Sequence, residues 1–290
     1  MKKTICLLGM LLLSFALVSC GGAKKEKQET VVRKTAEQFA GYQMDQASLK
    51  KTGSYEEGGV SAVVTGLSYE DVVTKINLHI KNDTDSPLRV MTANLSINGL
   101  MSTDSLFSEI PARSEQDGFV EISNEWFGKM GIKKITEAEF VVKVFDSDNN
   151  EIMQSEVIRV ETDAPASYKQ NYDDSGFEIY NENGVKLSAR SLQKSELSDN
   201  MEIVFYAENN TDSAISIMSG NVSVNGKSIE PLFVMSVGAG KKAVDTMVFY
   251  DKDLKELEIG EIQTVEAKFK AFNENLETVF ETDAVKVPIA

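Results

Sequence analysis

The stretch Asn82–Gly99 reads NDTDSPLRVMTANLSING, and 127 residues later Asn209–Gly226 reads NNTDSAISIMSGNVSVNG. The two copies align without a gap, and nine of the 18 aligned positions are identical. Most of the other positions exchange one apolar residue for another. A period of this length indicates duplicated domains rather than a solenoid of short repeats. The sequence therefore predicts two related domains in tandem.

Alternating apolar residues predict that each copy is built from β-strands. Between Val72 and Ile80 every second residue is apolar or threonine, the period of a half-buried strand. The polar run Asn82–Pro87 is typical of a loop, and Asn98-Gly99 suits a hairpin turn because both residues accept a positive φ. Short helical links are predicted at Glu125–Met130 and Asp251–Leu257. About seven short strands per copy, with turns every eight to twelve residues, indicate an all-β chain of two tandem Ig-like antiparallel β-sandwich domains.

The N-terminus has the organisation of a secretion signal. Lys2 and Lys3 precede an apolar run of 14 residues, Ile5–Val18, which is too short to span a bilayer as a stable helix. The run ends in Leu17-Val18-Ser19-Cys20, which resembles the lipobox of bacterial lipoproteins. The resemblance implies that diacylglycerol is attached to Cys20 and that the chain is cut before it. The predicted address is a membrane surface on the extracytoplasmic side, either the periplasmic face or the cell surface.

These signals divide the chain into five segments. They are a signal peptide at 1–19, a tether at 20–54, a first Ig-like domain at 55–165, a linker at 166–176 and a second Ig-like domain at 177–290. Glycines and charges after Cys20 are typical of a flexible tether. The apolar spacing in residues 31–50 allows either a short amphipathic helix or a stalk.

Composition narrows the classes of partner and chemistry. The formal net charge is −15, and removal of Lys2 and Lys3 with the signal peptide would make the chain more negative still. An acidic surface disfavours nucleic acid and anionic lipid as partners. The two cysteines, Cys6 and Cys20, both precede the domains, so no disulfide, cysteine nucleophile or thiolate metal site is expected there. No cofactor is expected.

Few residues suggest catalysis or metal binding. His79 is the only histidine, and it is out of step with the apolar face of its strand, so it is predicted to point to solvent. The segment Asp146-x-Asp148-x-Asn150 matches the first three ligand positions of a calcium loop, but Glu151 replaces the required glycine. A polar hairpin turn is the favoured interpretation there. No catalytic residue and no metal ligand is predicted.

Other motifs have an ordinary structural explanation. Trp126-Phe127 is read as a core plug under the helical link or as an exposed contact. The segment Gly238-x-Gly240-Lys241-Lys242 lacks the spacing and the following helix of a phosphate loop, so a solvated turn is predicted. Acidic pairs are expected by chance in a chain with 45 acidic residues; examples are Glu56-Glu57, Asp173-Asp174 and Glu256 with Glu258.

The second copy carries a family resemblance. Its order of Asn-Asn-Thr-Asp, an apolar strand, Val-Asn-Gly, Gly-Ala-Gly-Lys-Lys-Ala and then Asp-Leu before Glu-Ile-Gly resembles the Ig-like, telokin-like domains of secreted bacterial lipoproteins. The first copy departs from it where Arg113-Ser114 replaces Gly240-Lys241. The resemblance implies a fold and an extracytoplasmic setting, with no catalytic residue.

The sequence thus predicts a membrane-anchored lipoprotein, held at Cys20, that acts as a non-catalytic binding or structural adaptor of the cell envelope. The expected partner is an envelope protein or polymer. Two alternatives remain open at this point: a carrier of a small ligand or metal ion, and a carboxylate-dependent hydrolase.

Overall fold

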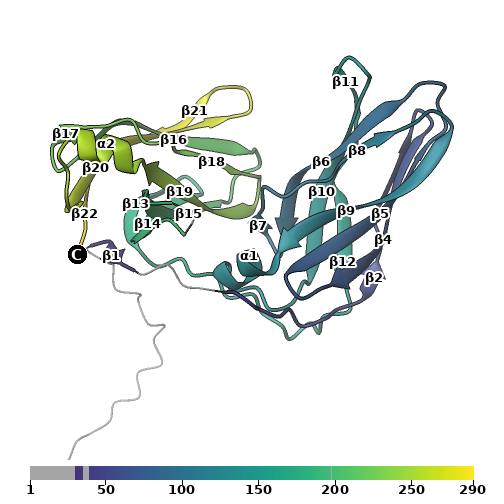
Figure 1. Cartoon of the computed structure of the whole chain (residues 1–290), viewed down its shortest axis with the longest axis horizontal. Helices are drawn as coiled ribbons and strands as arrows, with labels where there is room; N and C mark the ends of the chain where they lie inside the picture. Colours follow the sequence, from purple (N-terminus) through teal and green to yellow (C-terminus); the bar gives the residue numbers. More distant parts are fainter. Residues whose placement is uncertain (1–29, 35–38, 197) are drawn as a thin grey trace, which may run out of the picture.

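The computed structural model describes residues 30–34, 39–196 and 198–290. The predicted signal peptide and the predicted lipidation site Cys20 therefore lie outside the described residues. Figure 1 shows two lobes side by side, the first in blue and teal and the second in green and yellow. Both lobes are antiparallel β-sandwiches, so the predicted all-β fold is confirmed.

The first sandwich packs a four-stranded sheet against a sheet centred on two long strands. The four-stranded sheet has the order β3 (Ser54–Glu57), β4 (Val60–Tyr69), β5 (Val73–Asn82) and β9 (Ser114–Ser123). The facing strands are β6 (Leu88–Ile97), β7 (Leu100–Met101), β8 (Phe107–Ile110), β10 (Glu137–Phe145), β11 (Glu151–Gln154) and β12 (Ile158–Thr162). Alternate residues of both sheets point inward and form one core, in which Ile76, Ile97 and Phe140 are at most 1% exposed.

The second sandwich repeats this arrangement with its own core. One sheet contains β13 (Phe177–Glu182), β14 (Val185–Lys194), β15 (Met201–Asn209) and β19 (Lys241–Phe249). The other contains β16 (Ile215–Val224), β17 (Lys227–Ser228), β18 (Val234–Val237), β20 (Thr264–Asn273), β21 (Thr278–Glu281) and β22 (Val285–Pro288). Phe205 fills the core centre, with its ring centroid 4.7 Å from that of Phe233 and 5.7 Å from that of Phe269.

The two predicted helical links are confirmed as α1 (Asn124–Lys129) and α2 (Asp251–Glu256). The Ser123 hydroxyl caps α1 by accepting a hydrogen bond from the backbone N–H of Glu125. Phe127 is fully buried, as a core plug should be, and Trp126 packs edge-on against it with ring centroids 5.2 Å apart. Among the described residues no helix combines the length and the apolar character needed to cross a membrane.

The described part of the predicted tether differs from both alternatives that the sequence allowed. Neither a helix nor a free stalk forms in residues 30–34 and 39–54. Val31 is fully buried in the second core, and β1 (Val32–Arg33) pairs in parallel with β14 beside the C-terminus (Figure 1). Farther along, β2 (Leu49–Lys51) pairs with β12 of the first sandwich. These residues, 30–34 and 39–54, form an N-terminal arm that contacts both lobes. A strand forms at Val31 and Val32 because β-branched residues favour extended backbone and an open sheet edge supplies the hydrogen bonds.

One buried side chain explains why the repeated stretch begins with asparagine. The Asn82 side chain is fully buried, and its Nδ2 donates to the carbonyls of Ser86, Ile110 and Pro111 at 2.9–3.1 Å. Its Oδ1 accepts from the backbone N–H and the hydroxyl of Thr84. The amide thus satisfies the polar groups of two loops that no sheet ladder reaches.

The second copy makes the same bonds at the same offset. Asn209 Nδ2 donates to the carbonyls of Ser213, Val237 and Gly238, and its Oδ1 accepts from Thr211. We call Asn82 and Asn209 the asparagine locks. They confirm the alignment that places Val237–Lys241 opposite Ile110–Ser114.

The turn at the end of the repeat is held in a similar way. Asn98 and Asn225 have φ values of 50° and 52°, in the left-handed region that asparagine tolerates. Their side chains donate to the carbonyls of Lys134 and Glu261, which occupy equivalent places before β10 and β20. Three of the nine identical residues, namely the lock asparagine, the threonine two positions later and this turn asparagine, thus bond to the backbone through their side chains.

We predict that Asn209→Ala lowers the free energy of unfolding by about 2–3 kcal/mol, because it leaves three buried carbonyls without a donor. Asn210→Ala is the matched control, since Asn210 is the next residue and is exposed. Urea denaturation of both variants measures the difference. Equal stabilities would contradict the role assigned to the lock.

Candidate functional site

The single histidine lies on the outer face of the first sandwich. His79 Nδ1 is 2.8 Å from Oδ1 of Asp117, and Nε2 is 3.7 Å from a carboxylate oxygen of Glu115. The hydrogen bond to Asp117 and the negative charge of both carboxylates raise the pKa of His79. These three residues stand on the outer face of β5 and β9, where His79 and Asp117 are direct cross-strand neighbours. The arrangement is that of a surface ion pair.

The calcium-like segment is a closed hairpin turn. Asp146 Oδ1 accepts from the backbone N–H groups of Asp148 and Asn150, each at 2.9 Å, and Oδ2 accepts from the Asn150 side chain. These bonds, above all those from Asn150, lower the pKa of Asp146. Asn273 makes the same turn in the second copy. No group of three or more potential metal-binding side chains occurs in the described part of the chain.

The three acidic pairs do not converge on a common site. Glu56 and Glu57 are exposed on the edge strand β3, and Glu256 and Glu258 are exposed at the end of α2. Asp173 and Asp174 lie in the predicted linker and pair with Arg190 and Lys186 of β14. The burial of Asp173 opposes its ionisation, but Ser175 and Arg190 outweigh this effect and lower its pKa.

A largely buried ionic cluster lies where the two sandwiches meet. Glu139 of β10 is 4% exposed, and its carboxylate contacts Arg159 of β12 and Lys241 of β19. Burial disfavours its charged form, but Lys241 and Arg159 outweigh that effect, so the pKa of Glu139 lies below its usual value. The triad joins the first sandwich to the second. We call Glu139, Arg159 and Lys241 the junction triad.

Backbone pairing and packing reinforce the triad. The N–H of Lys242 donates to the carbonyl of Gly99 at 2.9 Å, so that β19 continues the sheet of the first sandwich through β7. The Lys242 ammonium lies 4.7 Å from the ring centroid of Tyr172, which comes from the predicted linker. Met101 packs against the second core, and Val244 packs against the first.

The prediction of a solvated turn at Gly238–Lys242 was therefore incomplete. Gly240 does turn the chain, with φ +67°, but Lys241 and Lys242 that follow it belong to the interface between the sandwiches. The sequence held one signal of this, the replacement of Gly240-Lys241 by Arg113-Ser114 in the first copy. Only the tertiary structure shows that this difference lies at the junction.

One open cavity of about 350 Å³ lies beside the N-terminal arm. It is lined by Gln46, Ala47, Ser48, Leu49, Thr65, Gly66, Leu67, Tyr69 and Asp163. Tyr69 and Asp163 already bond to the backbone of Ala47 and Ser48. The polar groups of the wall are thus largely used to fix the arm.

Comparisons with known proteins add only distant likenesses. No protein family matches the sequence, and no curated protein does. Among solved structures, the YadV chaperone is 14% identical with a TM-score of 0.23, covering 74% of this chain and 91% of its own. A protein of unknown function from Porphyromonas gingivalis is 10% identical with a TM-score of 0.21, covering 75% and 90%. Red sea bream transglutaminase is 6% identical with a TM-score of 0.23, covering 76% of this chain, which spans only 29% of that enzyme. These values carry no functional assignment.

We predict that Lys241→Met loosens the junction, because Glu139 then stays buried with Arg159 as its only cation. The expected loss of unfolding free energy is about 2 kcal/mol, and small-angle X-ray scattering should show a larger radius of gyration. Lys268→Met, a partly exposed lysine of β20, is the control. An unchanged radius and stability would show that the triad does not hold the lobes together.

A second prediction concerns Asp245 of β19, whose pKa is raised by burial although the Thr246 N–H partly offsets the effect. The folded state therefore binds this proton more tightly than the unfolded state, and stability falls as the pH rises from about 3.8 through the raised value. We expect Asp245→Asn to be more stable than the parent at pH 7 and not at pH 3. Thermal unfolding across this pH range measures the difference, and a constant offset would contradict the explanation.

Proposed function

We propose that the protein is a membrane-anchored extracytoplasmic lipoprotein that acts as a non-catalytic binding or structural adaptor of the cell envelope. The observation that carries the proposal is the sequence Leu17-Val18-Ser19-Cys20 at the end of an apolar run of signal-peptide length. Lipidation at Cys20 with two or three acyl chains would hold the chain firmly to a membrane.

The N-terminal arm supports this proposal by its position. Nine residues separate Cys20 from Thr30, where the described chain begins. Fully extended, they reach about 30 Å at most. Because Val31 is buried in the second core, the second sandwich would be the lobe nearer to the membrane.

The surface chemistry favours binding over catalysis. In the described residues, the side chains of His79 and Asp146, two of the candidates for reactive chemistry, are paired with neighbours at the surface. Two copies of one scaffold with different loops suit an adaptor, because loops can vary while the sandwich stays constant.

A carrier of a small ligand is the second candidate function, and the cavity beside the N-terminal arm is the observation that favours it. Its volume is at the lower end of the range for ligand pockets. This is the weaker candidate, because polar groups of the cavity wall already form hydrogen bonds with the N-terminal arm. A ligand would have to compete with those bonds.

We predict that mass spectrometry of the N-terminal peptide from purified membranes finds Cys20 with a diacylglyceryl or triacyl modification. Cys20→Ala should move the protein from the membrane fraction to the soluble fraction, whereas Cys6→Ala, the control within the signal peptide, should not. An unmodified N-terminus farther along the chain would indicate a freely secreted protein and refute the anchor.

A further inference from the structure

Each sandwich presents the same row of side chains on the outer face of one sheet. In the first, Phe107 of β8, Met91 of β6 and Lys143 of β10 are direct cross-strand neighbours. In the second, Val234 of β18, Met218 of β16 and Lys270 of β20 occupy the equivalent positions. We call these two sets the methionine rows.

The rows expose apolar surface that the fold does not require. Phe107 is 62% exposed, Val234 is 52% exposed and Met218 is 39% exposed. Met91 and Met218 are among the nine identical pairs of the repeat, yet they point away from both cores. Bonds to the backbone explain the lock asparagines and the threonines that follow them, but no such bond explains these methionines. A flexible thioether surface suits the binding of a partner's apolar side chains.

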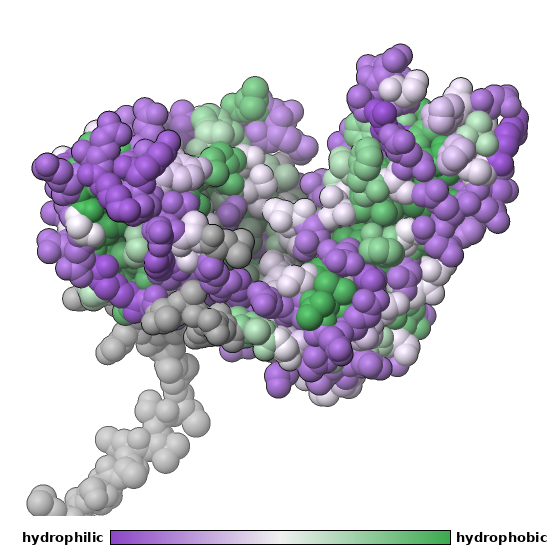
Figure 2. Space-filling model, viewed as in Figure 1, coloured by the Kyte–Doolittle hydropathy of each residue, from purple (hydrophilic) through white to green (hydrophobic). Residues whose placement is uncertain are grey.

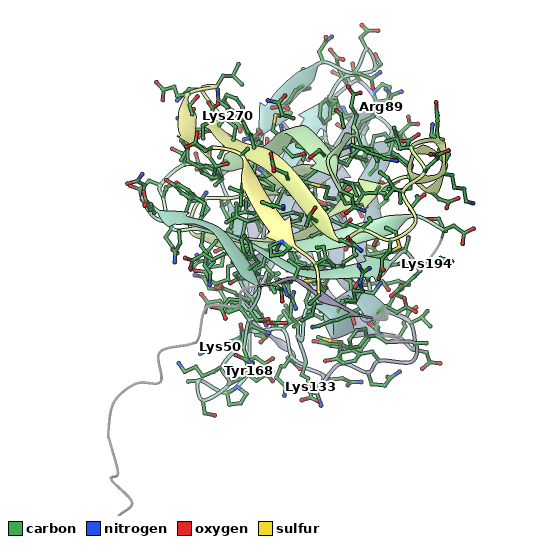
Figure 3. The ribbon with its side chains drawn as sticks, turned by 90° about the vertical axis from the view of Figure 1, so that its left-hand side faces the viewer. Lys50, Arg89, Lys133, Tyr168, Lys194 and Lys270 are labelled. Carbon is green, nitrogen blue, oxygen red and sulfur yellow. The ribbon has the colours of Figure 1, made fainter. Side chains whose placement is uncertain are left out.

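The strands that carry the two rows border one hollow. Figure 2 shows a notch between the lobes, with hydrophobic side chains over β6 and β8 on one wall and over β16 and β18 on the other. In the perpendicular view of Figure 3, Arg89 next to Met91 and Lys270 next to Met218 both lie at the upper end, opposite Lys50 and Lys133. The hollow therefore opens away from β1, where the N-terminal arm enters the second lobe (Figure 1).

Acidic hairpin tips stand on both sides of this opening. The β10–β11 turn carries Asp146, Asp148 and Glu151, and the β20–β21 turn carries Glu274 and Glu277, with no lysine or arginine in either turn. Neither Asp148 nor Glu274 forms an ion pair with a described residue. The three cations of the walls are already paired, Lys143 with Glu151, Lys270 with Glu281 and Arg89 with Glu109, so the charge left over at the rims is negative. Such a surface is complementary to an apolar segment flanked by positive charges.

One residue at a rim is unusual for its backbone conformation. Leu276, at the tip of the β20–β21 turn, has φ +62° and is 82% exposed, whereas the equivalent residue of the first copy is Asn149 with φ +65°. A leucine in the left-handed region is strained, and asparagine is the residue that tolerates it. Neither stability nor solubility explains Leu276, which makes it a candidate contact for a partner.

We propose that the hollow is the docking surface for an extended polypeptide segment with an apolar centre and lysine or arginine at both ends. Its apolar side chains would lie on the methionine rows, and its cations would lie near the acidic tips. The strands β8 and β18 favour an extended segment, because each is a four-residue edge strand that ladders with only one neighbour among the described strands. This inference rests on the proposed binding role and names the partner's chemistry.

The test uses the purified full chain and a synthetic fluorescent peptide of about eleven residues, with alternating valine and threonine between two lysines at each end. Such a strand presents its valines on one face. Two control peptides replace lysine by glutamate or valine by serine. Fluorescence anisotropy should show saturable binding of the first peptide, weakened by salt, and about ten-fold weaker binding of either control. Binding that ignores the lysines or the valines would overturn the proposal.

Variants locate the site. The double variant F107S/V234S should weaken binding of the lysine–valine peptide about ten-fold, whereas Phe119→Ser should not. Phe119 is 45% exposed on the opposite sheet of the first sandwich and is the matched control. Leu276→Asn should weaken binding while leaving the thermal unfolding temperature equal or higher. Equal affinity in F107S/V234S and the parent would place the peptide elsewhere and overturn the proposal.

A vesicle-binding experiment distinguishes a lipid surface from a peptide as the partner. Vesicles of phosphatidylglycerol should not bind in competition with the peptide, because the rims are acidic. Vesicle binding that F107S/V234S abolishes would assign the surface to lipid and overturn the peptide assignment. The peptide assay does not depend on lipidation of Cys20, so failure of the anchor and failure of the docking surface are distinguishable.

Discussion

The structure depends on the burial of one amide in each sandwich. A loop that crosses the end of a β-sandwich carries N–H and C=O groups that no ladder can pair, and leaving them buried and unpaired costs free energy. Asn82 and Asn209 solve this by bonding the loop that follows β5 or β15 to the strand end across the sandwich. Threonine two residues later completes the bonds. This explains why the repeat keeps its first asparagine and the threonine two residues later at fixed places.

Two of the sequence differences between the copies are explained by the junction between the sandwiches. Leu100 and Met101 of the first copy are replaced by the exposed Lys227 and Ser228 in the second. The first pair continues the sheet into the next lobe, whereas the second pair faces solvent. Lys241 likewise completes the junction triad, and Ser114 stands in its place in the first copy. If both copies had kept the apolar pair and the lysine, the second sandwich of one chain could have made this junction with the first sandwich of another chain. Repeated head-to-tail contacts of that kind do not close into a ring and risk producing open polymers.

The junction also gives the hollow a defined shape. Two sandwiches joined by a flexible linker would present their methionine rows at variable distances. The shared sheet, the junction triad and the N-terminal arm instead bring both rows to one opening. A preorganised surface of this kind loses less conformational freedom when a partner binds.

The sequence by itself determined the local chemistry of this protein. The strands follow from alternation near residues such as Ile76 and Leu78, and the turns follow from Asn98-Gly99, because side-chain period and backbone preference are local properties. The duplication was readable because the locks require the same residues at the same spacing. The tertiary structure alone decided the rest: that Val31 is buried in the core of the second sandwich, that Lys241 meets Glu139 across 102 residues, and that the strands carrying the methionine rows border one hollow. Such contacts depend on how two finished sandwiches sit against each other, and no local pattern of residues encodes that geometry.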